Sequence, residues 1–330
     1  GDDQECWSST ADESGNVAFE VHGSDTDAVL DAPRTSQVTV HWFLFRPDGS
    51  RIADAPVTYG LFPQGSGFHG AYWLGGPGIE VLRNLSADGQ IHDDEKEAFG
   101  SDESPALMGR GWREGVVTAG VSVSPTGASP SGVLTFTRFD GAGNQQIRTA
   151  RTIPIPGAVV GIAEAGAFAR PTAAFLMPRD AGGKWSGDLY VYWTDLDPAP
   201  SGSRPWDEKL LASGVDPASF IAHPLLDGTL AVRINGVWAV LKEYDATLGP
   251  APAWLASHPG HDFTIVRGER AYALMQSGRN SMDLVSKQGS SCGTVTFPGV
   301  GGVTSGADGT VIGASGAGGC TKKWWSGLLR

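Results

Sequence analysis

Tryptophan residues in polar stretches are the first candidates for chemistry. The chain has 11 tryptophans, and three of them stand in Gly- or Pro-rich stretches beside Arg or Lys. Flat exposed rings in such places stack on sugar rings or anchor a protein partner. We predict a ligand-binding surface formed by these rings and nearby arginines: Trp112, Trp185, Trp206, Arg110, Arg113 and Arg179. The alternative is that the rings fill gaps in the core, as large aromatic side chains usually do.

An acidic run is the second candidate. Asp93, Asp94, Glu95 and Glu97 form the densest group of carboxylates in the chain. Oxygen ligands at close spacing suit Ca²⁺, although the run lacks the glycine and the Asp-x-Asp frame of an EF-hand loop. We therefore predict a calcium site here, with a solvated loop as the alternative.

Two further motifs carry less chemistry. Residues Gly289 to Gly293 match Gly-x-Ser-x-Gly, but no helix and no later histidine follow, so a turn is predicted instead of a nucleophile. His258, His261 and Asp262 share one loop, yet a structural zinc site needs four ligands and no further Cys or His is near in sequence. Loop solvation is the preferred interpretation for this second group.

The cysteines suggest an oxidising compartment. Cys292 and Cys320 both lie in Gly-rich surroundings near the C-terminus, and we predict a disulfide between two adjacent strands. The alternative is two buried free thiols, and Cys6 is left over. The first residues, Gly1 to Asp3, show no leader, as expected of a mature exported chain. Sequence alone does not say whether a lipid anchor preceded them.

Charge and hydropathy exclude some partners. The formal net charge of the 330-residue chain is -12, so nucleic acid, which requires a basic face, is not an expected partner. No apolar run approaches the roughly 20 residues needed to cross a bilayer, so no membrane span is predicted. The sequence predicts a soluble protein.

Pairs of β-strands recur along the whole chain. A strand followed by an Asp-Gly-type turn occupies 40–49, 79–89 and 133–141, and looser copies begin at 189, 237, 282 and 321. A second strand precedes each copy, at 16–21, 69–74, 116–123, 172–176, 228–233, 270–275 and 309–313. Few segments have a helical period; the range 207–213 is one predicted short helix.

These hairpins predict an all-β fold. Repeats of about 40 to 50 residues are typical of the four-stranded blades of a β-propeller. We predict one domain, 1–330, with seven blades favoured over six; a large sandwich or a two-domain β protein is the alternative. The last blade ends after its third strand, so a segment around Cys6 and Trp7 is expected to complete it and close the ring.

The C-terminal residues resemble a known group. The segments 291–297, 306–311 and 319–325 are similar to poorly characterised exported propeller-like proteins and lipoproteins of Gram-negative bacteria. The resemblance covers roughly the last 50 residues. It implies export to the periplasm or the cell surface, and it implies no reaction.

The leading functional hypothesis is an exported binding protein. Long loops on one face of the propeller would recognise a surface carbohydrate or an envelope protein. A rival is a hydrolase or lyase that acts on polysaccharide, with Asp180, Asp195 and Asp207 as candidate acids, since a glycosidase needs two carboxylates about 5 to 10 Å apart. A third possibility is a structural surface component without a small ligand.

Overall fold

A computed structural model gives the fold of the chain. It describes residues 5–12, 14–23, 39–56, 61–64, 67–73, 80–85, 91–99, 107–110, 116–124, 131–139, 145–153, 157–164, 172–180, 183–194, 207–242, 247–266, 272–276, 280–305, 310–315 and 321–325. The chain divides into two compact units, 1–97 with 261–330 and 98–260, which we call unit 1 and unit 2. The prediction of a single domain stays a prediction.

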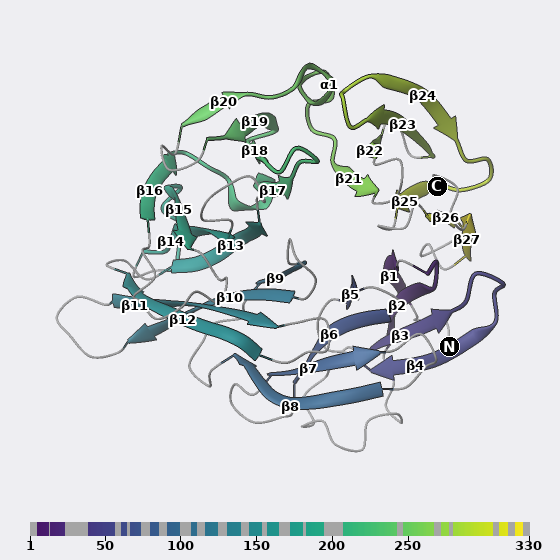
Figure 1. Cartoon of the computed structure of the whole chain (residues 1–330), viewed down its shortest axis with the longest axis horizontal. Helices are drawn as coiled ribbons and strands as arrows, with labels where there is room; N and C mark the ends of the chain where they lie inside the picture. Colours follow the sequence, from purple (N-terminus) through teal and green to yellow (C-terminus); the bar gives the residue numbers. More distant parts are fainter. Residues whose placement is uncertain are drawn as a thin grey trace. The chain divides into compact units, whose positions relative to one another are not determined.

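The described strands form antiparallel sheets of consecutive strands (Figure 1). Unit 2 has three sheets of four strands each. Their strands are β9 (Leu107–Arg110), β10 (Val116–Ser124), β11 (Ser131–Phe139) and β12 (Gln145–Ile153); β13 (Gly157–Glu164), β14 (Thr172–Pro178), β15 (Leu189–Thr194) and β16 (Asp207–Ala212); and β17 (Ile221–Pro224), β18 (Leu230–Ile234), β19 (Val237–Leu241) and β20 (Leu248–Pro250). The only helices among its described residues are η1 (Pro217–Ser219) and α1 (Ala253–Ala256).

Unit 1 contains three further four-stranded sheets and one of three strands. Its strands are β1 (Glu5–Ala11), β2 (Val17–Gly23), β3 (Thr39–Phe45) and β4 (Arg51–Pro56); β5 (Leu61–Gln64), β6 (Gly67–Trp73), β7 (Glu80–Leu85) and most of β8 (Ile91–Phe99); β21 (Phe263–Val266), β22 (Tyr272–Gln276), β23 (Ser281–Ser286) and β24 (Ser291–Thr296); and β25 (Gly302–Ser305), β26 (Val311–Ser315) and β27 (Thr321–Trp325). The first and last sheets of the chain are in contact through β1 and β25.

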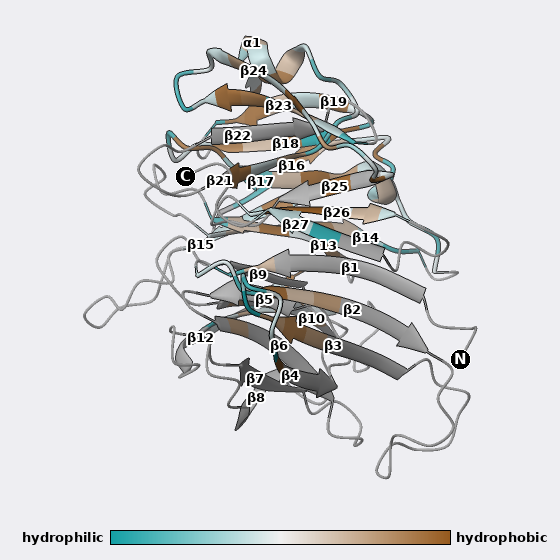
Figure 2. Ribbon diagram, turned by 90° about the vertical axis from the view of Figure 1, so that its right-hand side faces the viewer, coloured by the Kyte–Doolittle hydropathy of each residue, from teal (hydrophilic) through white to brown (hydrophobic). Residues whose placement is uncertain are grey.

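The predicted hairpins are confirmed, one in every sheet. Each predicted pair corresponds to the second and third strands of a sheet, from β2–β3 at the beginning of the chain to β26–β27 at its end. The middle strand β14 is apolar because both of its faces are covered, and it is buried at every position. Hydrophobic segments of middle strands such as β23 are brown in Figure 2.

One turn geometry joins several of the strands. Within the ranges 12–16, 46–50, 180–184, 225–229 and 286–290, the first N–H donates to the fifth carbonyl and the fourth N–H donates to the first carbonyl. The fourth residue is always glycine, with φ between 79° and 85°. This left-handed conformation is open to glycine at little steric cost, and it marks a type I turn followed by a bulge. The predicted Asp-Gly turn at Gly49 and the predicted turn at Gly289 are both of this kind.

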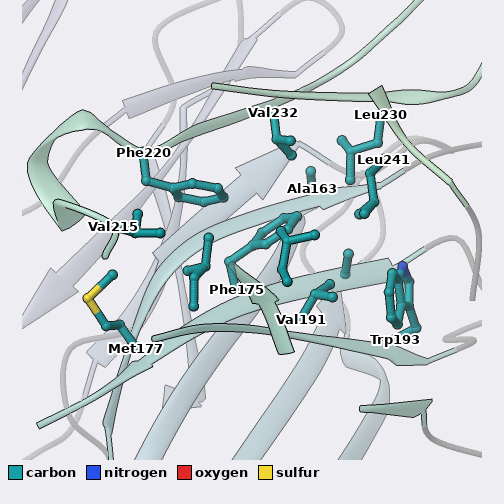
Figure 3. Close-up of a cluster of buried hydrophobic side chains, with 13 residues drawn as sticks. Ala163, Phe175, Met177, Val191, Trp193, Val215, Phe220, Leu230, Val232 and Leu241 are labelled. Carbon is teal, nitrogen blue, oxygen red and sulfur yellow. The ribbon is translucent and has the colours of Figure 1, made fainter. Parts of the chain in front are cut away.

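Apolar clusters hold neighbouring sheets together within each unit. In unit 2, the largest cluster lies between the sheets β13–β16 and β17–β20, where the rings of Phe175 and Phe220 are 4.8 Å apart (Figure 3). A second cluster, around Phe136 and Leu176, joins β9–β12 to β13–β16. In unit 1, Phe19 of β2 packs against Trp324 of β27, so side chains from both ends of the chain share one core.

The outer and first strands differ from expectation. Residues 207–213 were predicted to be helical, but 207–212 form the strand β16, because pairing with β15 overrides the helix-forming residues Glu208, Lys209 and Leu210. Three strands of the last sheet are described, β25 to β27, but the prediction that Cys6 and Trp7 complete this sheet is wrong. They belong to β1, which pairs with β2 in the first sheet. Within the described residues, no helix is long and apolar enough to cross a membrane.

Candidate functional site

The two ends of the sheet β13–β16 carry different polar groups. At one end, Glu164, Thr172 and Thr194 lie opposite one another on β13, β14 and β15; we call this end the Glu164 edge. At the other end, Arg179 and Trp185 form an antiparallel bridge that extends the β14–β15 hairpin; we call it the Trp185 edge. A strand the length of β14 separates the two edges by about 20 Å.

Arg179 is stacked on Trp185. The guanidinium carbon of Arg179 lies 3.9 Å from the centroid of the Trp185 ring system. This is well inside the distance of about 6 Å at which a cation is attracted to an aromatic face. Arg179 is exposed and Trp185 is half-buried, so the pair presents a charged, planar group to solvent above an aromatic base.

The base of this pair is held in place. Trp185 packs against the core cluster between the sheets β13–β16 and β17–β20. The tip of the hairpin is fixed by hydrogen bonds from the Lys184 N–H to the Asp180 carboxylate at 2.9 Å and from the Ser186 N–H to the Pro178 carbonyl at 3.0 Å. Rigid support of this kind fixes the position of the exposed guanidinium.

Hydrogen bonds also tie the Trp185 edge to the next sheet. The Val215 N–H donates to the Gly187 carbonyl at 2.9 Å. The Asn235 side chain accepts from the Asp216 N–H at 3.1 Å and donates to the Gly214 carbonyl at 3.0 Å. The connection between β16 and β17 is therefore fixed on both sides.

Arg179 differs from other described arginines in its hydrogen bonding. Arg46, Arg138, Arg151 and Arg233 each have a hydrogen-bonding or ionic partner in the protein. The guanidinium of Arg179 has none in the part of the chain that the structure describes. Its planar set of donors is consequently available to a ligand.

The Glu164 edge holds a buried ion pair. Nη2 of Arg138, on β11, pairs with Oε1 of Glu164, and the Thr172 hydroxyl donates to the same oxygen at 2.8 Å. All three residues are buried. Nε of Arg138 and Oγ1 of Thr194 are buried there without a hydrogen-bond partner. This arrangement fastens the sheets β9–β12 and β13–β16 together, and it offers no exposed charge.

Tyr192 forms a second polar contact near the same edge. Its hydroxyl donates to Oε1 of Glu208 at 3.0 Å, and Nη2 of Arg151 lies 3.8 Å from Oε2. Burial, followed by the negative charge of Glu208, raises the pKa of the Tyr192 phenol above its ordinary value. The phenol therefore stays a neutral hydrogen-bond donor at neutral pH.

The structure separates the predicted contact residues. Arg110 is the last residue of β9 and pairs with Val116 of β10. Val116 pairs in turn with Phe139, the neighbour of Arg138 on β11, so Arg110 lies at the Glu164 edge. Trp112, Arg113 and Trp206 lie outside the described residues. Arg179 and Trp185 are brought together at the opposite edge.

The predicted metal ligands belong to a strand. Asp93, Asp94, Glu95 and Glu97 are positions of β8, the outer strand of its sheet, and do not form a loop. Among the described side chains, no three that could ligate a metal ion come together. The calcium site stays a prediction.

The predicted disulfide is not formed in the structure. Cys292 is an exposed free thiol on β24, and its Sγ lies 3.8 Å from the Ser290 carbonyl oxygen that accepts its hydrogen bond. Cys320 lies outside the described residues and directly precedes β27. Because β24 and β27 belong to different sheets, the two cysteines do not flank adjacent paired strands as the prediction required.

The candidate catalytic acids are also separated. Asp207 opens β16 opposite Trp193, which pairs with Ala173 near the beginning of β14. Asp180 follows the other end of β14, about 20 Å away at the usual rise per residue. A glycosidase pair requires about 5 to 10 Å between its carboxyl groups, and the backbone separation of these two residues is well above that. Asp195 lies outside the described residues.

Solved structures with the same arrangement of strands define the fold. No family model and no curated protein matches the sequence. An acylaminoacyl peptidase bound to Z-Gly-Gly-Phe-chloromethyl ketone superposes with a TM-score of 0.56 at 10% identity, over 95% of this chain and 49% of that chain. The β-propeller domain of the trilobed protease from Pyrococcus furiosus superposes with a TM-score of 0.50 at 8% identity, over 94% and 89% of the two chains. The scaffold is of the β-propeller type.

The likeness to these structures concerns the fold alone. Acylaminoacyl peptidase from Pyrococcus horikoshii superposes with a TM-score of 0.52 at 9% identity, over 94% of this chain and 49% of its own. The chain thus spans about half the length of the two acylaminoacyl peptidases. At such identities the propeller scaffold is shared, while function has to be argued from the residues of this chain.

Some polar groups were not predicted from the sequence. The buried pair of Arg138 and Glu164 joins two sheets, and no local pattern indicates it. A second stacked pair, Arg233 with Trp238, was also missed. The signal was available: in both stacked pairs an arginine at the end of a second strand is followed by a tryptophan at or before the start of the third strand.

Proposed function

We propose that this chain is an exported, seven-bladed β-propeller that binds a surface carbohydrate through the Trp185 edge. Seven sheets are seen among the described strands, and the first and last of them are in contact. Export is supported by the resemblance of the C-terminal residues to exported propeller-like proteins. An envelope protein is the alternative partner.

One observation carries the proposal. Arg179 is exposed, stacked on Trp185, and without a hydrogen-bonding partner in the described part of the protein. The rigid support already orders the planar donor group, so the side chain of Arg179 loses less conformational entropy when a ligand binds. Core packing explains the position of Trp185, but it does not explain why an exposed guanidinium is stacked on this ring.

A glycan array tests the proposal. The purified protein is screened with calcium and again with a chelator, together with the Arg179→Gln variant and the double variant Trp112→Ala/Trp206→Ala. Saturable binding that Arg179→Gln abolishes supports the Trp185 edge. Loss only in the double variant would move the site to the segments that carry Trp112 and Trp206, and loss only in chelator would point to the acidic strand β8. A blank array on all arms removes the carbohydrate proposal.

The other functional classes are separated by different measurements. Turnover of a polysaccharide by the purified chain would establish an enzyme, and no binding assay could substitute for it. Saturable capture of one envelope protein, abolished by Arg179→Gln, would establish the alternative partner. A chain with neither activity would be a structural surface component.

Cell fractionation tests the export proposal. The chain is expected in the periplasmic or outer surface fraction of the cells that make it. Recovery in the cytosolic fraction alone would contradict export.

A further inference from the structure

We infer that Arg179 is the anchor for a carboxylate, and that the ligand of the Trp185 edge is an acidic sugar of the uronate class. The inference rests on the proposed carbohydrate-binding function and names the chemistry of the ligand. It comes from a comparison of two stacked pairs on neighbouring sheets.

The second pair is Arg233 with Trp238. The two residues are directly opposite each other on β18 and β19, as Arg179 and Trp185 are at the end of β14–β15. The guanidinium carbon of Arg233 lies 5.5 Å from the centroid of the Trp238 ring. Here the guanidinium has an internal partner: its Nη1 donates to the Gly260 carbonyl at 3.1 Å. The acceptor comes from the segment that follows the last strand of the sheet.

In the sheet β13–β16, the segment after the last strand interacts with Asn235 of the neighbouring sheet instead. That segment contains Gly214, and its carbonyl accepts from the Asn235 side chain at 3.0 Å. Arg179 is left with no acceptor from the described residues, although it stacks more closely on its ring than Arg233 does. The same structural unit is therefore closed by the protein in one sheet and open to an external acceptor in the next.

The geometry favours a carboxylate as the acceptor. A guanidinium presents two parallel N–H groups that match the two oxygens of a carboxylate, and a bond between charged groups is stronger than one between neutral groups. The stack fixes the plane of this donor pair. Arg179 also covers one face of Trp185, so a neutral sugar cannot stack on that face, and recognition falls to the charge.

The charged residues around Arg179 favour a ligand that carries a single negative charge on the sugar that is bound. Lys184 adds a second cation beside Arg179, and Asp180 and Asp188 add two carboxylates, so the hairpin tip is close to neutral. The chain as a whole carries a net charge of -12. A polyphosphate or an acidic peptide, with several charges close together, would be repelled by these carboxylates. A uronate brings one carboxylate among hydroxyl groups, which can donate to acceptors such as Asp180 and Asp188.

Calorimetry with two matched ligands tests the inference. A neutral oligosaccharide that ends in a single galacturonate, and the methyl ester of that galacturonate, differ only in the carboxylate. Wild-type protein should bind the acid at least about tenfold more tightly than the ester, as expected for the loss of a charge-assisted hydrogen bond. The Arg179→Gln variant should lose this preference, and Arg179→Lys should keep only part of it because lysine lacks the planar donor pair.

The control variant is Lys209→Gln. Lys209 is an exposed cation on β16 of the same sheet, and its loss changes the net charge of the protein by the same amount. Its affinity for the acid should stay within about threefold of wild type, because a distant surface charge is largely screened. Equal weakening by Lys209→Gln and Arg179→Gln would reduce the effect to general electrostatics and would overturn the inference.

The outcomes separate the inference from the proposed function. If neutral glycans bind on the array, Arg179→Gln abolishes that binding, and the acid and ester bind equally, the Trp185 edge is a carbohydrate site but not a uronate site. If no glycan binds at all, both are wrong. The comparison of acid with ester needs no variant, so it remains decisive even if Arg179→Gln fails to fold.

Discussion

Arg138 and Arg179 belong to opposite ends of the same pair of neighbouring sheets, and their environments are opposite as well. Arg138 is buried, paired with Glu164, and removed from solvent. Arg179 is exposed, stacked on Trp185, and without a hydrogen bond or ion pair among the described residues. The first arginine joins β11 to β13. The second joins nothing beyond its own hairpin.

The difference between the two arginines indicates which charged groups serve the fold and which are candidates for function. A buried charge must be paired because desolvation is costly, so its partner is dictated by folding. An exposed guanidinium has no such requirement, and its fixed orientation above a ring has to be explained otherwise. We therefore expect loss of Arg138 to lower the stability of the fold and loss of Arg179 to lower ligand binding.

Removal of Arg138 should give the largest effect. Arg138→Met leaves the carboxylate of Glu164 buried without its cation, which typically costs about 3 to 5 kcal/mol. Urea denaturation should show this loss in the free energy of unfolding. The double variant Arg138→Met/Glu164→Leu should recover most of it, since a buried pair can often be replaced by apolar groups. A single-variant loss below about 1 kcal/mol would contradict the cohesive role assigned to Arg138.

Truncation of Trp185 should come next. Trp185→Ala removes a half-buried ring that packs on the core, and a loss of about 2 kcal/mol is expected from the apolar area involved. Trp185→Phe keeps a ring in place and should cost clearly less. The same denaturation experiment measures both variants. Equal losses would mean that core contact alone does not explain the position of the indole.

The phenol of Tyr192 should produce a smaller, pH-dependent effect. Its pKa is raised by burial in the folded protein, whereas the unfolded chain releases the proton near the ordinary value of 10.0. Above that pH the unfolded state binds fewer protons, so this contribution to stability is complete below pH 10 and falls as the pH rises. Tyr192→Phe should cost about 1 kcal/mol at pH 7 and should make the alkaline decline less steep. Unfolding measured at pH 7 and above pH 10 checks both statements; an unchanged slope would show that the phenol ionises freely in the folded state.

Removal of Arg179 should have the smallest effect on stability. An exposed cation–π contact contributes about 0.5 to 1 kcal/mol, so Arg179→Gln should unfold nearly as wild type does. A loss in the free energy of unfolding as large as that of Arg138→Met would contradict the difference between the two edges and would make Arg179 a structural residue. Near-ultraviolet circular dichroism of the variant provides the matching check on its fold.

The repeat of the fold could be predicted because its signal is local. Middle strands such as β15 contain apolar runs, here Leu189–Thr194, that stand out in the sequence. The outer strands β8 and β16, in contrast, contain several charged residues. For this reason the sequence predicts a loop at β8 and a helix at β16, where the structure has strands.

The candidate site could be predicted only in part. Arg179 and Trp185 were both proposed from their residue types, and the structure brings them together. Their separation from Arg110 depends on strand register, which residue type does not reveal. The pairing of Arg138 with Glu164 depends on packing between two sheets, and it lies 26 residues apart in sequence. A contact between residues so far apart in sequence can be identified only once the packing of the two sheets is known.

The shared core of the first and last sheets has a consequence for biosynthesis. Phe19 of the first sheet packs against Ile312 and Trp324, which are synthesised only after the whole of unit 2. The three sheets of unit 2 contain only contiguous chain and can assemble while synthesis continues. The first sheet, in contrast, keeps an apolar face uncovered until the last sheet, which follows unit 2 in the sequence, has been synthesised. That face is the part of the nascent chain for which a chaperone would be most useful.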